Sequence, residues 1–187
     1  MKRCLLSLIT LTSLTSAGAL TLTGTLEGNA APDLRLSGWA VKGSGQPVAE
    51  LVSAAVKGGS FSLTLPTALP PAAAQSPVDN RISWPGLMDF GSASASAQAT
   101  EMKFFVYRDA NGNGQRDEGE TMREVRLNTG RSFVFVVWVS NDVTVTGSNG
   151  YAVNLYKGWN ALTVDVRSSV SVKPLDPKAS ITVNTGQ

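Results

Sequence analysis

The segment 109–120, DANGNGQRDEGE, has the residue types and the spacing of a calcium-binding loop. Ca²⁺ takes roughly six to eight oxygen ligands, and such a loop supplies them from its first, third, fifth, seventh, ninth and twelfth positions. Gly114 stands at the sixth position, where the loop must turn sharply. We predict a Ca²⁺ ion held by the side chains, or in one case the main-chain carbonyl (Gln115), of Asp109, Asn111, Asn113, Gln115, Asp117 and Glu120.

The segments on both sides of this loop alternate like strands. Residues 103–108 read KFFVYR and residues 124–127 read EVRL. Arg116 stands at the eighth position, where a paired EF-hand usually carries an aliphatic residue. A calcium-triggered opening of two helices is therefore excluded as a mechanism. The alternative to a metal site is a polar Asn-Gly hairpin that binds no metal.

Short segments with a period of two run along the rest of the chain. Val, Ile, Leu, Thr, Phe and Trp alternate in them with polar residues, and Gly, Asn, Asp and Ser separate them. The expected strands are 20–27, 34–42, 60–65, 103–108, 124–127, 132–140, 143–146, 151–156, 161–166, 170–172 and 181–184. This many short strands predict an all-β fold, a sandwich or a barrel.

Two further segments have local signals. Asn149-Gly150 lies between two apolar runs and predicts a type I′ hairpin turn, in which both central residues have positive φ. Residues 47–57 fit a helical face as well as a strand, and we favour a strand because the neighbouring segments are strands.

Residues 66–101 are rich in Pro, Ala and Ser and have no sustained periodicity. So long a stretch is either a linker between two β halves or an insertion packed on one end of a single domain. We favour one antiparallel sandwich over 20–187 with an irregular insertion at 66–101, because 20–65 alone offers too few strands to bury a core.

The insertion contains an apolar cluster, WPGLMDF, at residues 84–90. It either plugs an open end of the sandwich or forms an exposed lip that binds a partner. We favour the plug.

The chain of 187 residues contains no histidine. This excludes the Ser-His-Asp triad, the Cys-His pair and His-ligated zinc sites. The acidic residues outside the loop show no pairing that spacing could reveal. We therefore predict no catalytic residues and a protein that is not an enzyme.

Residues 1–19 have the organisation of an export signal. Lys2 and Arg3 precede a short apolar run at 5–14, and small residues follow at 17–19. Cys4, the only cysteine, lies before that run, so the mature chain would contain no disulfide. We expect an exported protein, extracellular, periplasmic or associated with the cell envelope, with no membrane span after the signal is removed.

The charge of the mature chain argues against polyanionic partners. Without Lys2 and Arg3, the chain has 14 basic residues of the original 16, which equals its 14 acidic residues, so its formal net charge is zero. Basic residues are not gathered in a stretch interleaved with aromatics, so nucleic acid is not an expected partner.

The segment FVYRDANGNGQRDEGE, residues 104–120, resembles the strand and loop of calcium-binding, prealbumin-like or Cna-B-like β-sandwich domains, such as the B-type repeats of bacterial surface adhesins. Residues 59–66 also resemble the G-x-F-x-L strand of such modules. The resemblance implies an Ig-like or prealbumin-like sandwich in which the same six loop residues hold a structural Ca²⁺. The chain departs from that family in its single copy of the loop and its long insertion, so an adhesin role is not implied.

We accordingly expect a structural or protein-interaction module, stabilised by Ca²⁺, that contacts another cell-envelope protein or itself. The alternative is a module that binds carbohydrate or an apolar ligand. It would use the loop 84–90 or exposed tryptophans, although Trp39, Trp138 and Trp159 are expected mainly to pack against the sheets.

Overall fold

The computed structural model describes residues 20–28 and 31–184, so the predicted signal at 1–19 lies outside the described residues. Apart from one 3-10 helix, η1 (Ala72–Ala74), every regular element is a strand. The strands are β1 (Thr21–Glu27), β2 (Leu34–Val41), β3 (Pro47–Ala55), β4 (Ser60–Thr64), β5 (Ser76–Pro77), β6 (Phe90–Ala93), β7 (Gln98–Arg108), β8 (Arg123–Thr129), β9 (Ser132–Val139), β10 (Val143–Gly147), β11 (Ala152–Leu155), β12 (Gly158–Val166), β13 (Val170–Pro174) and β14 (Ile181–Asn184). The predicted all-β class is confirmed.

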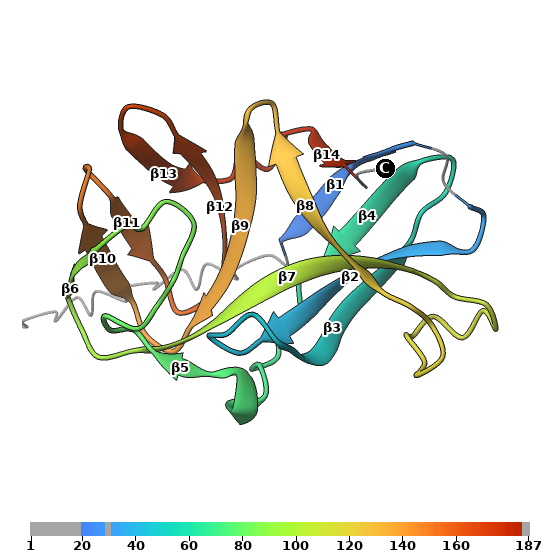
Figure 1. Cartoon of the computed structure of the whole chain (residues 1–187), viewed down its shortest axis with the longest axis horizontal. Helices are drawn as coiled ribbons and strands as arrows, with labels where there is room; N and C mark the ends of the chain where they lie inside the picture. The colour runs from blue at the N-terminus through green and yellow to red at the C-terminus, as the bar shows by residue number, and fades with distance from the viewer. Residues whose placement is uncertain (1–19, 29–30, 185–187) are drawn as a thin grey trace, which may run out of the picture.

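The strands form an 11-stranded sheet and a separate 3-stranded sheet. In the large sheet the order is β13-β12-β9-β7-β8-β14-β1-β4, and β2 branches from β7 and carries β3 at its free side. Every described pair is antiparallel except β1 with β14. Figure 1 shows the long strand β7 running along the molecule, and it pairs with β2, β8 and β9.

Alternate residues of the central strands feed two separate cores, one on each face of the sheet. On β9, Val134 and Val136 belong to the first core, whereas Phe135 and Val137 belong to the second. The period of two that predicts a strand is therefore apolar on both faces here, as expected for a sheet that is covered on both sides.

The first core lies between the central strands and the strands from both ends of the chain. Its fully buried members include Leu22, Leu36, Leu63, Leu127 and Ile181. Gly24 on β1 is required by this packing, because a Cβ there would meet the Ile181 carbonyl oxygen of the parallel neighbour at 2.1 Å.

The second core lies under the small sheet, in which β10 pairs with β11 and β6. Residues from the 66–101 segment complete it: Trp84 is 6% exposed, and its ring lies 5.8 Å from that of Phe135 between centroids. Leu87 and Phe90 pack against the same core, while Met88 is 71% exposed. Trp84 thus has the buried position that the plug interpretation requires.

Several local expectations can be compared with this structure. Asn149 and Gly150 have φ of 55° and 77° at the turn between β10 and β11, so the predicted hairpin is confirmed. Residues 47–55 form a strand, as favoured. The 66–101 segment is less irregular than expected, because it contains η1, β5 and β6, and β7 begins within it at Gln98. None of the described segments forms a helix long and apolar enough to cross a bilayer.

Candidate calcium-binding loop

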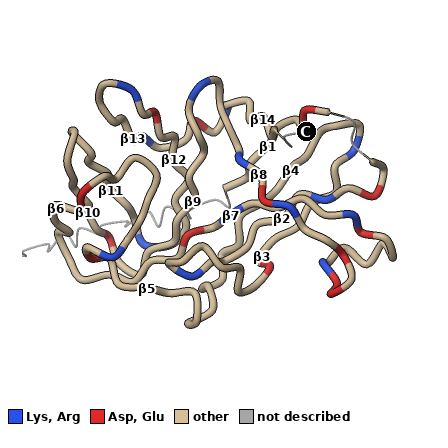
Figure 2. The backbone as a smooth tube through the Cα atoms, in the orientation of Figure 1, with Lys and Arg blue, Asp and Glu red and all other residues tan. Residues whose placement is uncertain are grey.

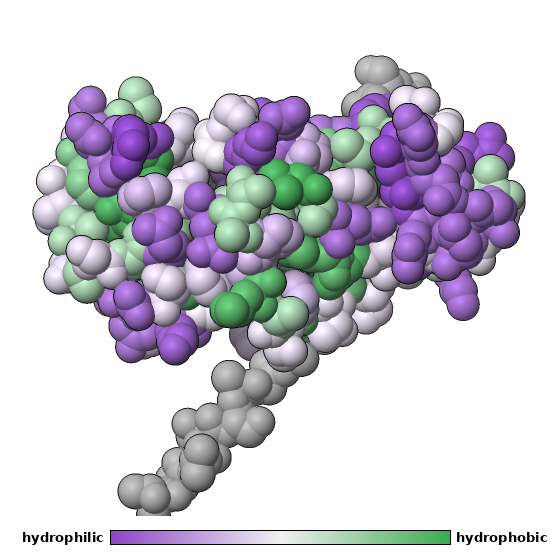
Figure 3. Space-filling view, turned by 90° about the horizontal axis from the view of Figure 1, so that it is seen from below, coloured by the Kyte–Doolittle hydropathy of each residue, from purple (hydrophilic) through white to green (hydrophobic). Residues whose placement is uncertain are grey.

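The loop 109–120 begins where β7 ends and is followed by β8. Its charged residues, four acidic and one basic, lie at one end of the molecule (Figure 2). In the view of Figure 3, hydrophilic side chains gather at this same end, whereas apolar ones gather nearer the middle. The loop is anchored at its start, because Asp109 N donates to Asp33 O at 2.9 Å. Next to it, Arg108 donates to the Asp33 carboxylate and holds the pKa of that group below its usual range.

Asp109 lies at the base of the loop and is 7% exposed. Its Oδ2 accepts the main-chain N–H of Gly114 at 2.9 Å and lies 3.6 Å from Nη1 of Arg35 on β2. Its Oδ1 is buried and receives no hydrogen bond from the described residues. Gly114 has a φ of +82°, so the glycine predicted to turn the loop does so. One oxygen of the first expected ligand therefore fixes the turn, and the other is left without a partner.

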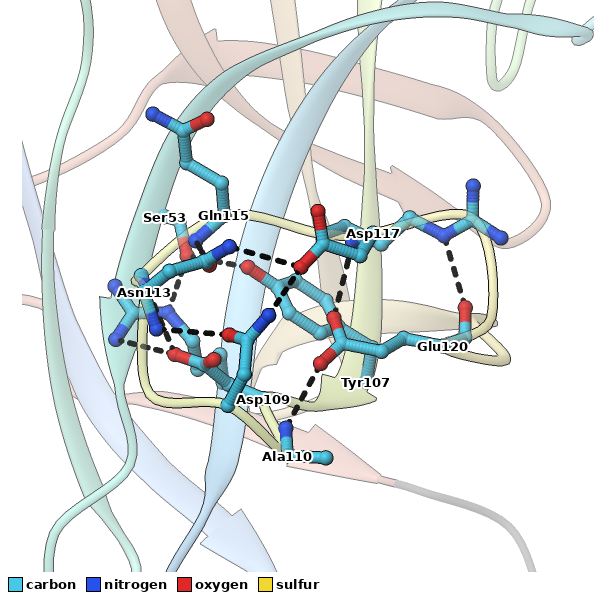
Figure 4. Close-up of polar contacts among 12 residues, drawn as sticks. Ser53, Tyr107, Asp109, Ala110, Asn113, Gln115, Asp117 and Glu120 are labelled. Atoms are coloured by element: carbon cyan, nitrogen blue, oxygen red, sulfur yellow. Dashed lines mark hydrogen bonds and ion pairs between the residues drawn. The ribbon is translucent and has the colours of Figure 1, made fainter.

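Asn113 points toward Asp117 across the loop (Figure 4), and Asn111 donates to the same carboxylate. The Nδ2 atoms of Asn111 and Asn113 donate to Asp117 Oδ2 at 2.6 and 2.8 Å. Their Oδ1 atoms accept the N–H groups of Asn113 and Gln115 at 3.0 and 2.8 Å. The third, fifth and ninth positions thus converge on one carboxylate oxygen.

Glu120 closes the loop onto its own beginning. Its Oε1 accepts the N–H of Ala110 at 2.8 Å, and its Oε2 accepts the N–H of Asp117 at 3.0 Å. Arg116 turns its guanidinium to the other side and donates to the Glu120 carbonyl at 2.8 Å. The Arg116 charge is therefore bound to main-chain oxygen at the rim of the loop.

The side chains of five of the six predicted ligand residues make hydrogen bonds within the loop. The sixth, Gln115, contributes its main chain, while its side chain extends away in Figure 4. The loop carboxylates engage amides and main-chain N–H groups. Accordingly, among residues 20–28 and 31–184 no group of three or more acidic, His or Cys side chains is gathered as a metal-binding cluster.

A polar network under the loop was not predicted from the sequence. Tyr107 on β7 donates its hydroxyl to Glu50 Oε1 at 3.2 Å and lies 3.2 Å from Ser53 Oγ, to which Arg35 Nε donates at 2.7 Å. The other oxygen of Glu50 accepts the N–H of Arg116 at 3.0 Å. Burial is the main cause that raises the pKa of Tyr107, which keeps it a donor. The network ties the loop to β2 and β3.

The tryptophans do not offer an exposed platform. Trp84 and Trp138 are buried, and Trp39 and Trp159 are partly buried. Trp39 also donates its Nε1 to Ser37 Oγ at 2.9 Å and packs edge-on against Phe105. A sugar-binding face built on exposed tryptophans is therefore not supported by the side chains.

Comparison with known proteins adds no relative to this picture. No protein-family model, curated protein or solved structure matches the chain at a significant level.

Proposed function

We propose that this chain is an exported, calcium-binding β-sandwich that acts as a structural or protein-interaction module of the cell envelope or extracellular space. The observation that carries the proposal is the buried, unpartnered Oδ1 of Asp109, the first residue of the loop. A buried carboxylate oxygen without a hydrogen bond costs free energy, and a cation bound to it would remove that cost.

The chemistry of the other donors fits Ca²⁺. All are oxygens of carboxylates, amides or the main chain, which are the ligands that hard cations prefer. The amide nitrogens of Asn111 and Asn113 now occupy Asp117 Oδ2, the place where a cation would have to bind. A rotation of each side-chain amide would exchange these nitrogens for oxygens, so the same three residues could serve the metal.

The role that we propose for the metal is structural. The loop directly follows β7, the strand that contributes residues to both cores. The main-chain N–H of Arg116 in the loop donates to Glu50 on β3. A cation that stiffened the loop would therefore hold one end of the central strand. We propose that the fold is a sandwich of the Ig-like or prealbumin-like type. We expect the protein to bind a partner and not to catalyse a reaction.

Export is supported by the signal-like pattern of residues 1–19. The expected partner is another envelope protein or a second copy of the chain. Purification from the native envelope, with and without a chelator, tests this: loss of a defined partner in chelator supports a calcium-dependent interaction module, and retention of glycan alone contradicts it.

The metal itself is tested by calorimetry and thermal unfolding of the mature chain, titrated with Ca²⁺ and with Mg²⁺. We expect Ca²⁺ to bind, and Asp109→Asn to abolish binding. The matched control is Asp142→Asn, at an acidic residue outside the loop. Absence of Ca²⁺ binding, or equal affinity for Mg²⁺, would overturn the proposal.

A further inference from the structure

A groove of about 590 Å³ lies away from the loop, on the face of the large sheet that is turned from the first core. On β8, Val125 and Leu127 belong to that core, so the alternating residues Glu124 and Arg126 face the groove. The segment 83–86 and Met88 form one side of it, and the turn 43–45 between β2 and β3 lines it as well. A smaller hollow of about 190 Å³ adjoins it.

Glu101 on β7 lines both hollows. No hydrogen bond or ion pair reaches its carboxylate from the described residues, because Lys103, two positions along the strand, bonds Glu124 at 3.0 Å instead. Burial raises the pKa of Glu101 to about 7, and the neighbouring Glu124 adds to this effect while Lys103 opposes it. The groove thus contains one acidic group whose charge is unfavourable until something pairs with it.

The remaining lining supplies apolar surface. Trp84 and Phe133 are among the residues that line the groove, and Met88, which also lines it, is 71% exposed. An aromatic or thioether side chain beside a carboxylate suits a cation that carries an apolar body, because the rings attract the charge and cover the hydrocarbon.

The other charged groups are already balanced or lie at the rim. Those that line either hollow are Lys42, Arg81, Lys103, Glu124 and Arg126. Arg81 is paired with Asp79 and Lys103 with Glu124, while Lys42 and Arg126 are exposed. Among the described residues that line the two hollows, Glu101 is therefore the carboxylate that no bonded basic side chain neutralises.

We propose that this groove binds a small organic amine, with the ammonium group against the Glu101 carboxylate and the apolar body against Trp84 and Met88. The site does not depend on the proposed calcium loop.

The test compares two probes of equal apolar length, hexylamine and 1-hexanol, in titrations of the mature chain followed by calorimetry. At about pH 8 we expect hexylamine to bind about tenfold more tightly than hexanol, the effect of one partly buried charge pair. Glu101→Gln should remove this preference. The matched control, Glu118→Gln, changes an exposed carboxylate of the loop and should retain it.

A pH series of the unaltered chain gives the same answer if Glu101→Gln fails to fold. Hexylamine stays protonated at about pH 5.5, whereas Glu101 becomes neutral, so the preference for the amine should disappear there. Equal binding of the two probes at about pH 8, a preference that persists at about pH 5.5 or in Glu101→Gln, or no binding of hexylamine would overturn the proposal.

Discussion

Glu50 on β3 accepts the main-chain N–H of Arg116 at 3.0 Å, although 66 residues separate the two along the chain. Its second oxygen accepts the Tyr107 hydroxyl at 3.2 Å. One carboxylate therefore joins the tip of the loop to the strand that leads into it. The loop is held from below before any metal is present.

Replacing Glu50 should loosen the loop and weaken the metal site together. A hydrogen bond to a charged group contributes roughly 1.5 to 3 kcal/mol, so we expect Glu50→Ala to lower the free energy of unfolding by about that amount. Calcium affinity should fall several-fold, because the free loop must then be ordered on binding. Chemical denaturation and calcium titration measure the two effects. Glu118→Ala is the control, since Glu118 is exposed on the same loop; equal effects of the two substitutions would contradict the argument.

Glu120→Gln separates the metal role of this residue from its structural one. Both Glu120 oxygens accept main-chain N–H groups, and an amide can accept only one of them. We expect a loss of about 1 kcal/mol without metal and no further stabilisation by Ca²⁺. In the unaltered chain, Ca²⁺ at about ten times its dissociation constant should add about 1.4 kcal/mol. Thermal unfolding in chelator and in Ca²⁺ checks this, and an undiminished calcium shift in the variant would exclude Glu120 as a ligand.

The sequence predicts a strand where polar and apolar residues alternate, or where the residues of both strand faces are apolar. Residues 132–140 are an example. Their run of Phe, Val and Trp predicts a buried strand, and β9 covers 132–139. β5 and β6 could not be predicted, because Ser-Pro and Phe-Gly-Ser-Ala are too short and too poor in apolar residues to show an alternation. Their pairing is decided by β7 and β10, far away in the sequence.

The candidate site likewise has one part that local sequence predicts and one part that depends on strands far away in the chain. Spacing alone proposed the loop residues, because a calcium loop takes its ligands from one continuous segment. It could not identify Glu50 and Arg35, which reach the loop only through the pairing of β2 with β3 and β7. The only sequence evidence for this support is the polar residues of β3, such as Glu50 and Ser53. Polar residues occur on any exposed strand face, so they do not identify a contact with the loop.

Trp84 should be essential to the second core. Its side chain is 6% exposed and packs against Phe135, so Trp84→Ala would leave a large cavity and cost about 3 to 5 kcal/mol. Met88→Ala, at an exposed position four residues on, is the control and should cost little. Chemical denaturation measures both. A Trp84→Ala protein of unchanged stability would show that residues 84–90 do not plug the fold.

The free energy of unfolding should decrease with rising pH because of Glu101. Its pKa is raised from 4.5 to about 7, so between these values the folded chain holds a proton that the unfolded chain has released. The stabilisation is complete below about pH 4.5 and is lost as the pH rises through about 7. It amounts to at most about 3 kcal/mol. Glu101→Gln should flatten this part of the profile, and Glu118→Gln should not. Parallel profiles for all three proteins would contradict the assignment.

Arg35 should oppose calcium binding and at the same time stabilise the metal-free protein, so its replacement should change these two quantities in opposite directions. Its guanidinium lies 3.6 Å from Asp109 Oδ2 and also donates to Ser53 Oγ at 2.7 Å. Arg35→Gln removes a positive charge beside the first calcium ligand, so calcium affinity should rise several-fold. The same change removes a hydrogen bond and the neutralising partner of a buried carboxylate, so the metal-free protein should unfold at a lower temperature. Arg131→Gln, at an exposed arginine in the turn between β8 and β9, should change neither quantity. If Arg35→Gln lowered both calcium affinity and stability, Arg35 would be a support of the loop and not a competitor of the cation.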